Sequence, residues 1–180
     1  MREKETDSAG ELLILVDNND VEIGLMDKES VHQTGALHRA FSVFTFNSEG
    51  LLLLQRRALN KYHSPGLWSN TCCSHPRKDE TTAAACSRRL MEEMGLECTL
   101  KFGFSFTYRA QFENGLIEHE FDHVYIGLTD DNPKPDQTEV MDWKYISTKE
   151  LQSEILAHPE HYTEWLKICF PKVVENINIK

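Results

Sequence analysis

Three scarcities in the sequence narrow the classes of protein to consider. No uninterrupted apolar run approaches the roughly 20 residues that a membrane-spanning helix needs. The first segment, MREKETDSAGE, lacks the apolar core of a secretory signal peptide. Positive charge is also scarce, because 19 Lys and Arg face 29 Asp and Glu, a formal net charge of −10. The sequence therefore argues against a nucleic acid or an anionic membrane as partner, although local basic groups can still bind a small anion.

Cysteine is sparse and irregularly placed. Five cysteines, an odd number without a secretory signal, predict reduced thiols and a cytoplasmic location. Two of them are adjacent in the stretch WSNTCCSHP, where a single residue separates Cys73 from His75. No second C-x-x-C completes a zinc site. The stretch therefore predicts catalysis or core packing rather than a disulfide.

Length and composition indicate one globular domain. Apolar residues make up 40% and charged residues 27% of the 180 residues, close to the averages of soluble proteins. No internal repeat or low-complexity linker divides the chain. We therefore expect a single domain over residues 1–180, with residues 1–10 as a flexible tail.

The pattern of apolar residues predicts strands and helices that do not alternate strictly. Apolar runs flank turn residues at 17–20, 47–50 and 113–115, which predicts three hairpins, and residues 51–54 read as a strand buried on both faces. Residues 79–95 predict a helix that ends at Gly95. After a loop at 132–135 and a strand at 140–146, a capping box at Ser147 predicts a helix that ends before Pro159. A last helix is expected over 160–178, interrupted at Pro171. The class is α+β with a mixed sheet.

Two glutamates and three histidines are candidate metal ligands. Glu118 and Glu120 project from the same face of an extended strand, where they repel unless a cation or a proton lies between them. The simpler alternative is a strand face turned to solvent. His32, His38 and His75 are further candidates, although taken singly each histidine fits a surface or hydrogen-bonding role better than ligation. Five other histidines show no such pattern and are interpreted as structural: His63, His119, His123, His158 and His161.

The helix from Glu80 to Leu96 follows most of the pattern G-x5-E-x7-R-E-U-x-E-E-x-G-U, the Nudix box, where U is aliphatic. Carboxylates three or four residues apart can present oxygens to divalent cations that bridge to a diphosphate. The alternative is an ordinary charged amphipathic helix. Two positions depart from the pattern: Ser74 replaces the first glycine, and Arg89 replaces the glutamate after the arginine. A guanidinium there favours a phosphate clamp over a cation site.

Taken together, motifs along nearly the whole chain resemble the type I isopentenyl-diphosphate isomerases, which are built on the Nudix fold. These motifs are H-x5-H-x-A-F, RRAL-x-K, P-G-x-W-x-N, C-x-H-P, the altered helix, YRA, E-x-E and a late Trp. The resemblance implies a Nudix-type mixed β-sheet sandwiched between α-helices. It also implies transfer of a double bond from isopentenyl to dimethylallyl diphosphate through a tertiary carbocation.

The resemblance further implies roles for individual residues. One divalent metal (Mn, Mg or Zn) is expected on His32, His38, His75, Glu118 and Glu120, and Glu93 is expected to assist a Mg²⁺ that accompanies the diphosphate. Cys73 and Glu120 are the expected acid and base, with the order of donation open, Tyr108 assists, and Trp165 covers the carbocation unless it is a core residue. Lys28, Arg57, Lys61 and Arg89 are expected to bind the diphosphate. A nearby metal and Arg would lower the pKa of the Cys73 thiol.

Two other functions compete with this interpretation. A Nudix pyrophosphohydrolase would use the helix glutamates, and a binding module would keep the fold without catalysis. Arg89 argues against the first, and the retained acid, base and ligand set argues against the second. The expected partner is a small isoprenoid diphosphate, with neither nucleic acid nor membrane, and the chain is expected to be a monomer or a weak homodimer.

Overall fold

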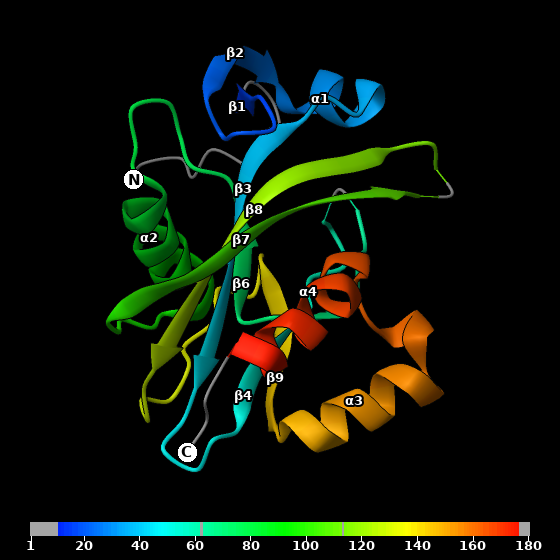
Figure 1. Cartoon of the computed structure of the whole chain (residues 1–180). Helices are drawn as coiled ribbons and strands as arrows, with labels where there is room; N and C mark the ends of the chain where they lie inside the picture. Colours follow the sequence, from blue (N-terminus) through cyan, green and yellow to red (C-terminus); the bar gives the residue numbers. More distant parts are fainter. Residues whose placement is uncertain (1–10, 62, 113, 177–180) are drawn as a thin grey trace.

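The computed structural model describes residues 11–61, 63–112 and 114–176 of the chain (Figure 1). The expected flexible tail, residues 1–10, lies outside these ranges. The described strands are β1 Leu12–Val16, β2 Glu22–Asp27, β3 His38–Phe46, β4 Leu52–Arg57, β5 Trp68–Ser69, β6 Cys72–Ser74, β7 Leu100–Gln111, β8 Ile117–Leu128 and β9 Val140–Ile146. The helices are α1 Lys28–Thr34, α2 Thr82–Met94, α3 Thr148–Ala157 and α4 Glu164–Asn176, with a 3-10 turn at Pro159–His161. None of the described helices has the length and apolar character needed to cross a membrane.

Strand β3 lies at the centre of a single mixed sheet. It pairs antiparallel with β1, β4 and β6, and parallel with β8. The parallel register sets His38 beside Glu120. On the other side of β8, the long antiparallel pairing with β7 sets Tyr108 beside Glu120. This register brings residues far apart in the sequence to one place on the sheet.

Helices cover both faces of the sheet (Figure 1). On one face, α2 packs Leu90 and Met94 against Val43 of β3. On the other, α3 and α4 pack with Phe44 and Val124 in a second apolar cluster. The expected α+β class, with a mixed sheet between helices, is confirmed.

Most expected elements occur at their predicted positions. The first and third hairpins form as β1–β2 and β7–β8, and a tight turn at 47–50 joins β3 to β4. Helix α2 ends at Gly95, whose φ of 60° belongs to the left-handed region. A β-carbon at Gly95 would lie 2.5 Å from the carbonyl oxygen of Lys134, so glycine is needed there. The capping box at Ser147 is present, with both of its hydrogen bonds to Glu150.

The prediction for the last helix was wrong in two respects. Helix α4 begins at Glu164, after the separate 3-10 turn, and it continues through Pro171. Proline removes one backbone hydrogen bond, but Phe170 and Val173 on either side of it are buried in the core. This burial holds the last turns in helical form. Residues 177–178 of the predicted helix lie outside the described residues.

Candidate functional site

A cavity of about 850 Å³ opens beside the sheet and contains most of the predicted site residues. Its walls come from the loop after β4, from β6, from the last turns of α2, from β8 and from α4. The predicted residues that line it are Lys28, Arg57, Lys61, Cys73, His75, Arg89, Glu93, Tyr108, Glu118, Glu120 and Trp165. His32 and His38 are fully buried immediately behind Glu118 and Glu120.

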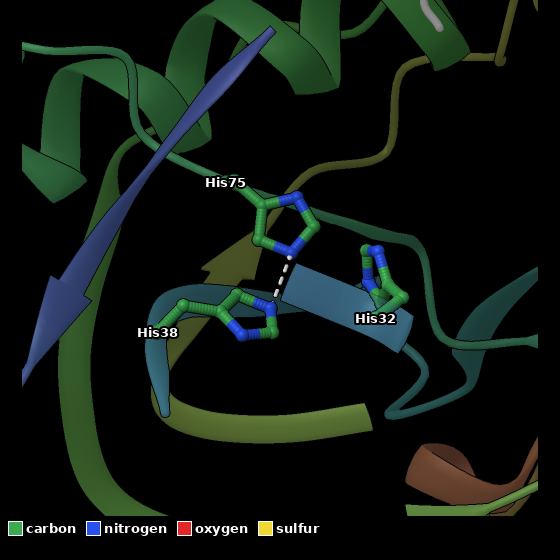
Figure 2. Close-up of side chains that lie close together, drawn as sticks. All are labelled: His32, His38 and His75. Carbon is green, nitrogen blue, oxygen red and sulfur yellow. Dashed lines mark hydrogen bonds between the residues drawn. The ribbon is translucent and has the colours of Figure 1, made fainter. Parts of the chain in front are cut away.

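The three predicted histidine ligands converge (Figure 2). His32 Nδ1 lies 2.6 Å from the carbonyl oxygen of Lys28, and His38 Nδ1 lies 3.0 Å from that of Ala36. Each ring therefore donates its Nδ1 proton to the backbone and turns Nε2 toward the other rings. His38 Nε2 lies 3.2 Å from His75 Nε2. Donation from one ring nitrogen to a carbonyl, with the other nitrogen directed inward, is typical of metal-binding histidines.

Glu118 and Glu120 point toward the same imidazoles. Glu118 Oε2 lies 3.3 Å from His32 Nε2, and Glu120 Oε1 lies 3.2 Å from His75 Nε2 and 3.6 Å from His38 Nε2. Their side chains are only 2% and 12% exposed, which excludes the alternative of a strand face turned to solvent. Two acidic side chains so deeply buried require positive charge nearby.

The ionisation of this cluster favours a bound cation. Burial raises the pKa of Glu118, but hydrogen bonds from His32 and His63 outweigh it and hold that pKa well below its usual range. Burial and the charge of Glu118 raise the pKa of Glu120, but its histidine partners bring the net value below normal. Burial lowers the pKa of His75, which favours the neutral ring. Three inward-facing nitrogens and two ionised carboxylates form a donor set that suits a divalent metal.

Tyr108 and Cys73 lie beside this cluster. The Tyr108 hydroxyl donates to Glu120 Oε2 at 2.7 Å. Cys73 lines the cavity, whereas Cys72 is fully buried against α2 because adjacent strand residues face opposite ways. Burial raises the pKa of the Cys73 thiol to about 12, although Arg57 opposes this. Arg57 lowers this pKa as expected, but burial outweighs it, so the raised pKa favours the protonated thiol at neutral pH.

The four predicted diphosphate-binding residues all line the cavity. Arg57 Nη2 donates to the carbonyl oxygen of His63 at 3.1 Å, and Lys28 Nζ lies 3.4 Å from Glu11 Oε2. Lys61 forms an ion pair with Glu139. All four therefore already have polar partners that a phosphate group would replace or share.

Arg89, the residue that departs from the Nudix box, forms the centre of a buried ion-pair network. Its guanidinium lies 2.6 Å from Glu93 Oε1, 2.9 Å from Glu92 Oε2 and 3.4 Å from Glu139 Oε2. Glu93 Oε2 also accepts a hydrogen bond from Gln55 at 2.8 Å. Burial raises the pKa of Glu93, but Arg89 and Lys61 bring the net value below normal. The helix thus offers a cation where a hydrolase of this pattern would offer a carboxylate.

Trp165 is buried but borders the cavity. Its indole N–H donates to Ser69 Oγ at 2.9 Å, and its ring lies 5.1 Å from the Arg57 guanidinium carbon. Trp165 is thus both a core residue and part of the cavity lining, and its role toward the substrate stays a prediction.

The sequence patterns missed two residues of the site. His63 was interpreted as structural, yet its Nε2 lies 2.8 Å from Glu118 Oε1. Asp122 is fully buried two residues after Glu120, and Ser42 Oγ donates to it at 2.8 Å. Strand alternation would have placed Asp122 on the face of Glu118 and Glu120, whereas no periodic signal marks His63.

The other four histidines interpreted as structural lie outside the cavity lining. His119 Nδ1 lies 2.9 Å from the carbonyl oxygen of Gly35, and His123 Nε2 lies 2.9 Å from Asp20 Oδ2. His158 and His161 are exposed beside Glu160.

Comparisons with known proteins identify the fold. The family model for the NUDIX domain matches residues 36–166. A crystal structure of DR0079 from Deinococcus radiodurans superposes with a TM-score of 0.76 at 22% identity, covering 90% of this chain and 98% of that one. A MutT protein from Methanosarcina mazei gives 0.65 at 16% identity, covering 80% and 96%. The chain therefore has a Nudix fold.

Sequence relatives narrow the family. The chain is 53% identical to "Isopentenyl-diphosphate Delta-isomerase 2" of Aromatoleum aromaticum over 90% of this chain and 86% of that protein. It is 51% identical to "Isopentenyl-diphosphate Delta-isomerase" of Pectobacterium atrosepticum over 89% and 90%. The chain belongs to the isopentenyl-diphosphate Delta-isomerase family.

Proposed function

We propose that the protein isomerises isopentenyl diphosphate to dimethylallyl diphosphate for isoprenoid synthesis. One observation carries the proposal. A single cavity brings together the Cys73 thiol, the Glu120 carboxylate with its hydrogen bond from Tyr108, a cluster of histidines and glutamates, and several Lys and Arg side chains. Moving the double bond requires a proton donor for the terminal alkene carbon and an acceptor for a proton of the neighbouring methylene. One group cannot easily serve both carbons, so two are needed.

Cys73 and Glu120 are the proposed donor and acceptor. Burial keeps the Cys73 thiol protonated. The histidine partners of Glu120 lower the pKa of that carboxyl and favour its ionised form. The group that carries a proton at rest is the natural donor, and the ionised one the natural acceptor. Tyr108 donates to Glu120 Oε2 and so assists proton transfer there, whereas Glu120 Oε1 faces His75 and His38. The face of Trp165 stabilises the carbocation between the two transfers, and the surrounding apolar atoms limit its capture by water.

The proposed metal ligands are His32, His38, His75, Glu118 and Glu120. Three imidazoles with two carboxylates suit Mn²⁺ or Zn²⁺ better than Mg²⁺. A divalent cation bound there would supply positive charge beside the substrate and hold both carboxylates by their oxygens. We also assign Glu93 to a Mg²⁺ that arrives with the diphosphate. Because Arg89 and Gln55 already hold its oxygens, that step requires one of these partners to yield.

Lys28, Arg57, Lys61 and Arg89 are the proposed diphosphate contacts, since all four line the same cavity. The substrate is thus a small isoprenoid diphosphate. A monomeric or weakly dimeric state, a cytoplasmic location, and the absence of nucleic-acid and membrane partners stay predictions.

The direct test is incubation of the metal-loaded protein with isopentenyl diphosphate in deuterated water. We expect deuterium in the dimethylallyl product by NMR and no inorganic phosphate. Cys73→Ser should keep the fold and lose nearly all turnover. Phosphate release instead of isomerisation would identify a hydrolase, and normal turnover of Cys73→Ser would exclude Cys73 as the donor.

A further inference from the structure

His63 lies in the segment between β4 and β5 and contacts the proposed metal site from the cavity side. Its side chain is 12% exposed, and its Nε2 lies 2.8 Å from Glu118 Oε1. This is the distance of a strong N–H to carboxylate hydrogen bond. It is shorter than the contacts of Glu118 with His32 and His38.

The two oxygens of Glu118 serve different partners. Oε2 lies 3.3 Å from His32 Nε2 and 4.0 Å from His38 Nε2, and thus faces the proposed metal ligands. Oε1 faces His63. A carboxylate rotates easily about its last bond unless both oxygens are held. The contact with His63 therefore fixes which oxygen is presented to the three imidazoles.

A second metal site that includes His63 is a weaker explanation of this contact than a hydrogen bond. His63, His32 and Glu118 do bring three ligand atoms within 4.8 Å of one another. However, His32 uses Nδ1 for the carbonyl oxygen of Lys28, so only Nε2 can bind a metal. The same Nε2 belongs to the group with His38 and His75. One nitrogen lone pair binds one ion, so His32 cannot complete two sites.

Aromatic side chains hold the His63 ring in place. It stacks on Phe112 with ring centroids 5.7 Å apart and an interplanar angle of 14°. It also meets Trp165 edge-on at 5.7 Å and 82°. Its backbone carbonyl accepts a hydrogen bond from Arg57 Nη2. His63 thus contacts both Arg57, a proposed diphosphate-binding residue, and Glu118, a proposed metal ligand.

We propose that His63 is a positioning residue, which donates to Glu118 Oε1 and thereby holds Oε2 toward the metal. The inference rests on the proposed function, in that Glu118 binds the metal. It extends that function because His63 lies outside the predicted ligand set.

The test compares three variants of the full chain, stripped of metal and titrated with Mn²⁺ by electron paramagnetic resonance. His63→Phe keeps a ring on Phe112 but removes the donor, whereas His63→Gln keeps an N–H donor of similar reach. His158→Phe is the control, because His158 is exposed and outside the cavity. Thermal melting of the metal-free proteins checks folding.

We expect His63→Phe to weaken Mn²⁺ binding about 10- to 100-fold, the range typical of partners that orient a metal ligand. His63→Gln should recover most of that loss, and His158→Phe should bind like the unchanged protein. At saturating Mn²⁺, His63→Phe should regain most of its kcat.

Two results would overturn the proposal. Mn²⁺ affinity of His63→Phe within twofold of the unchanged protein would remove any role toward the metal. Equal losses in His63→Phe and His63→Gln would show that the imidazole itself is required, as for a direct ligand. Failure of the unchanged protein to bind Mn²⁺ or to isomerise the substrate would instead refute the proposed function.

Discussion

The protonation state of Cys73 decides whether it can act as the proton donor or as the proton acceptor of the proposed reaction. Burial moves the pKa of its thiol from an ordinary value of 9.0 to about 12. At pH 8 the thiolate fraction is then about 10⁻⁴, against about 10⁻¹ for an unperturbed thiol. Because alkylating agents react with the thiolate, this difference should slow modification of Cys73 about a thousandfold.

Alkylation by iodoacetamide between pH 7 and pH 10 measures this pKa independently of catalysis. The metal-stripped protein is used, peptide fragmentation separates Cys73 from Cys72, and Cys73→Ser confirms the assignment. The same protein unfolded in urea provides the reference rate. Steric shielding lowers the rate by the same factor at every pH. The pKa is therefore read from the shape of the rate–pH profile and not from the absolute rate.

We expect the logarithm of the Cys73 rate to rise by about one for each pH unit, with no plateau up to pH 10. A plateau reached at or below pH 7 would show a thiolate at neutral pH and would refute Cys73 as the proton donor, and a plateau between pH 7 and pH 10 would refute the raised pKa. The pH range stops at 10 for a reason of stability. The folded chain retains this proton longer than the unfolded chain, so its stability falls as the pH rises from about 9 toward 12.

Three substitutions test other parts of the site and fold. Glu120→Gln should abolish turnover and weaken Mn²⁺ binding together, and loss of only one would separate the two roles. Tyr108→Phe should lower kcat about 10- to 100-fold, since a hydrogen bond to a charged acceptor contributes about 1.5–3 kcal/mol; unchanged kcat would exclude it from proton delivery. Gly95→Ala should destabilise the fold by about 1–3 kcal/mol in urea unfolding, because of its positive φ and the carbonyl of Lys134. An unchanged midpoint would contradict that account.

Short-range rules predict only part of the ligand cluster. Period-two alternation in β8 places Glu118 and Glu120 together, and the parallel pairing of β3 then sets His38 beside Glu120. That pairing joins segments about 80 residues apart, and only the family resemblance anticipated it. Asp122 obeys the same alternation but was overlooked, since an acidic residue in a strand is usually exposed.

His63 could not be predicted from the sequence for a different reason. It lies in an irregular segment where no periodicity relates residue number to direction. Its orientation depends on Phe112 and Trp165, which come from distant parts of the chain. For Pro171 a local rule gave the wrong prediction. Proline usually interrupts a helix, but the burial of Phe170 and Val173 keeps α4 helical through it.

An acidic chain can bind a diphosphate because charge is distributed unevenly. The described residues that line the cavity include five lysines and arginines and six carboxylates, so the lining has one formal negative charge, against −10 for the whole chain. A single divalent cation would make the lining positive, and a second would strengthen that charge. Arg89 also makes the lining less negative, because a glutamate at position 89 would lower the formal charge of the lining by two. Metal binding at the proposed ligands would therefore act together with Arg89 to favour an anionic substrate.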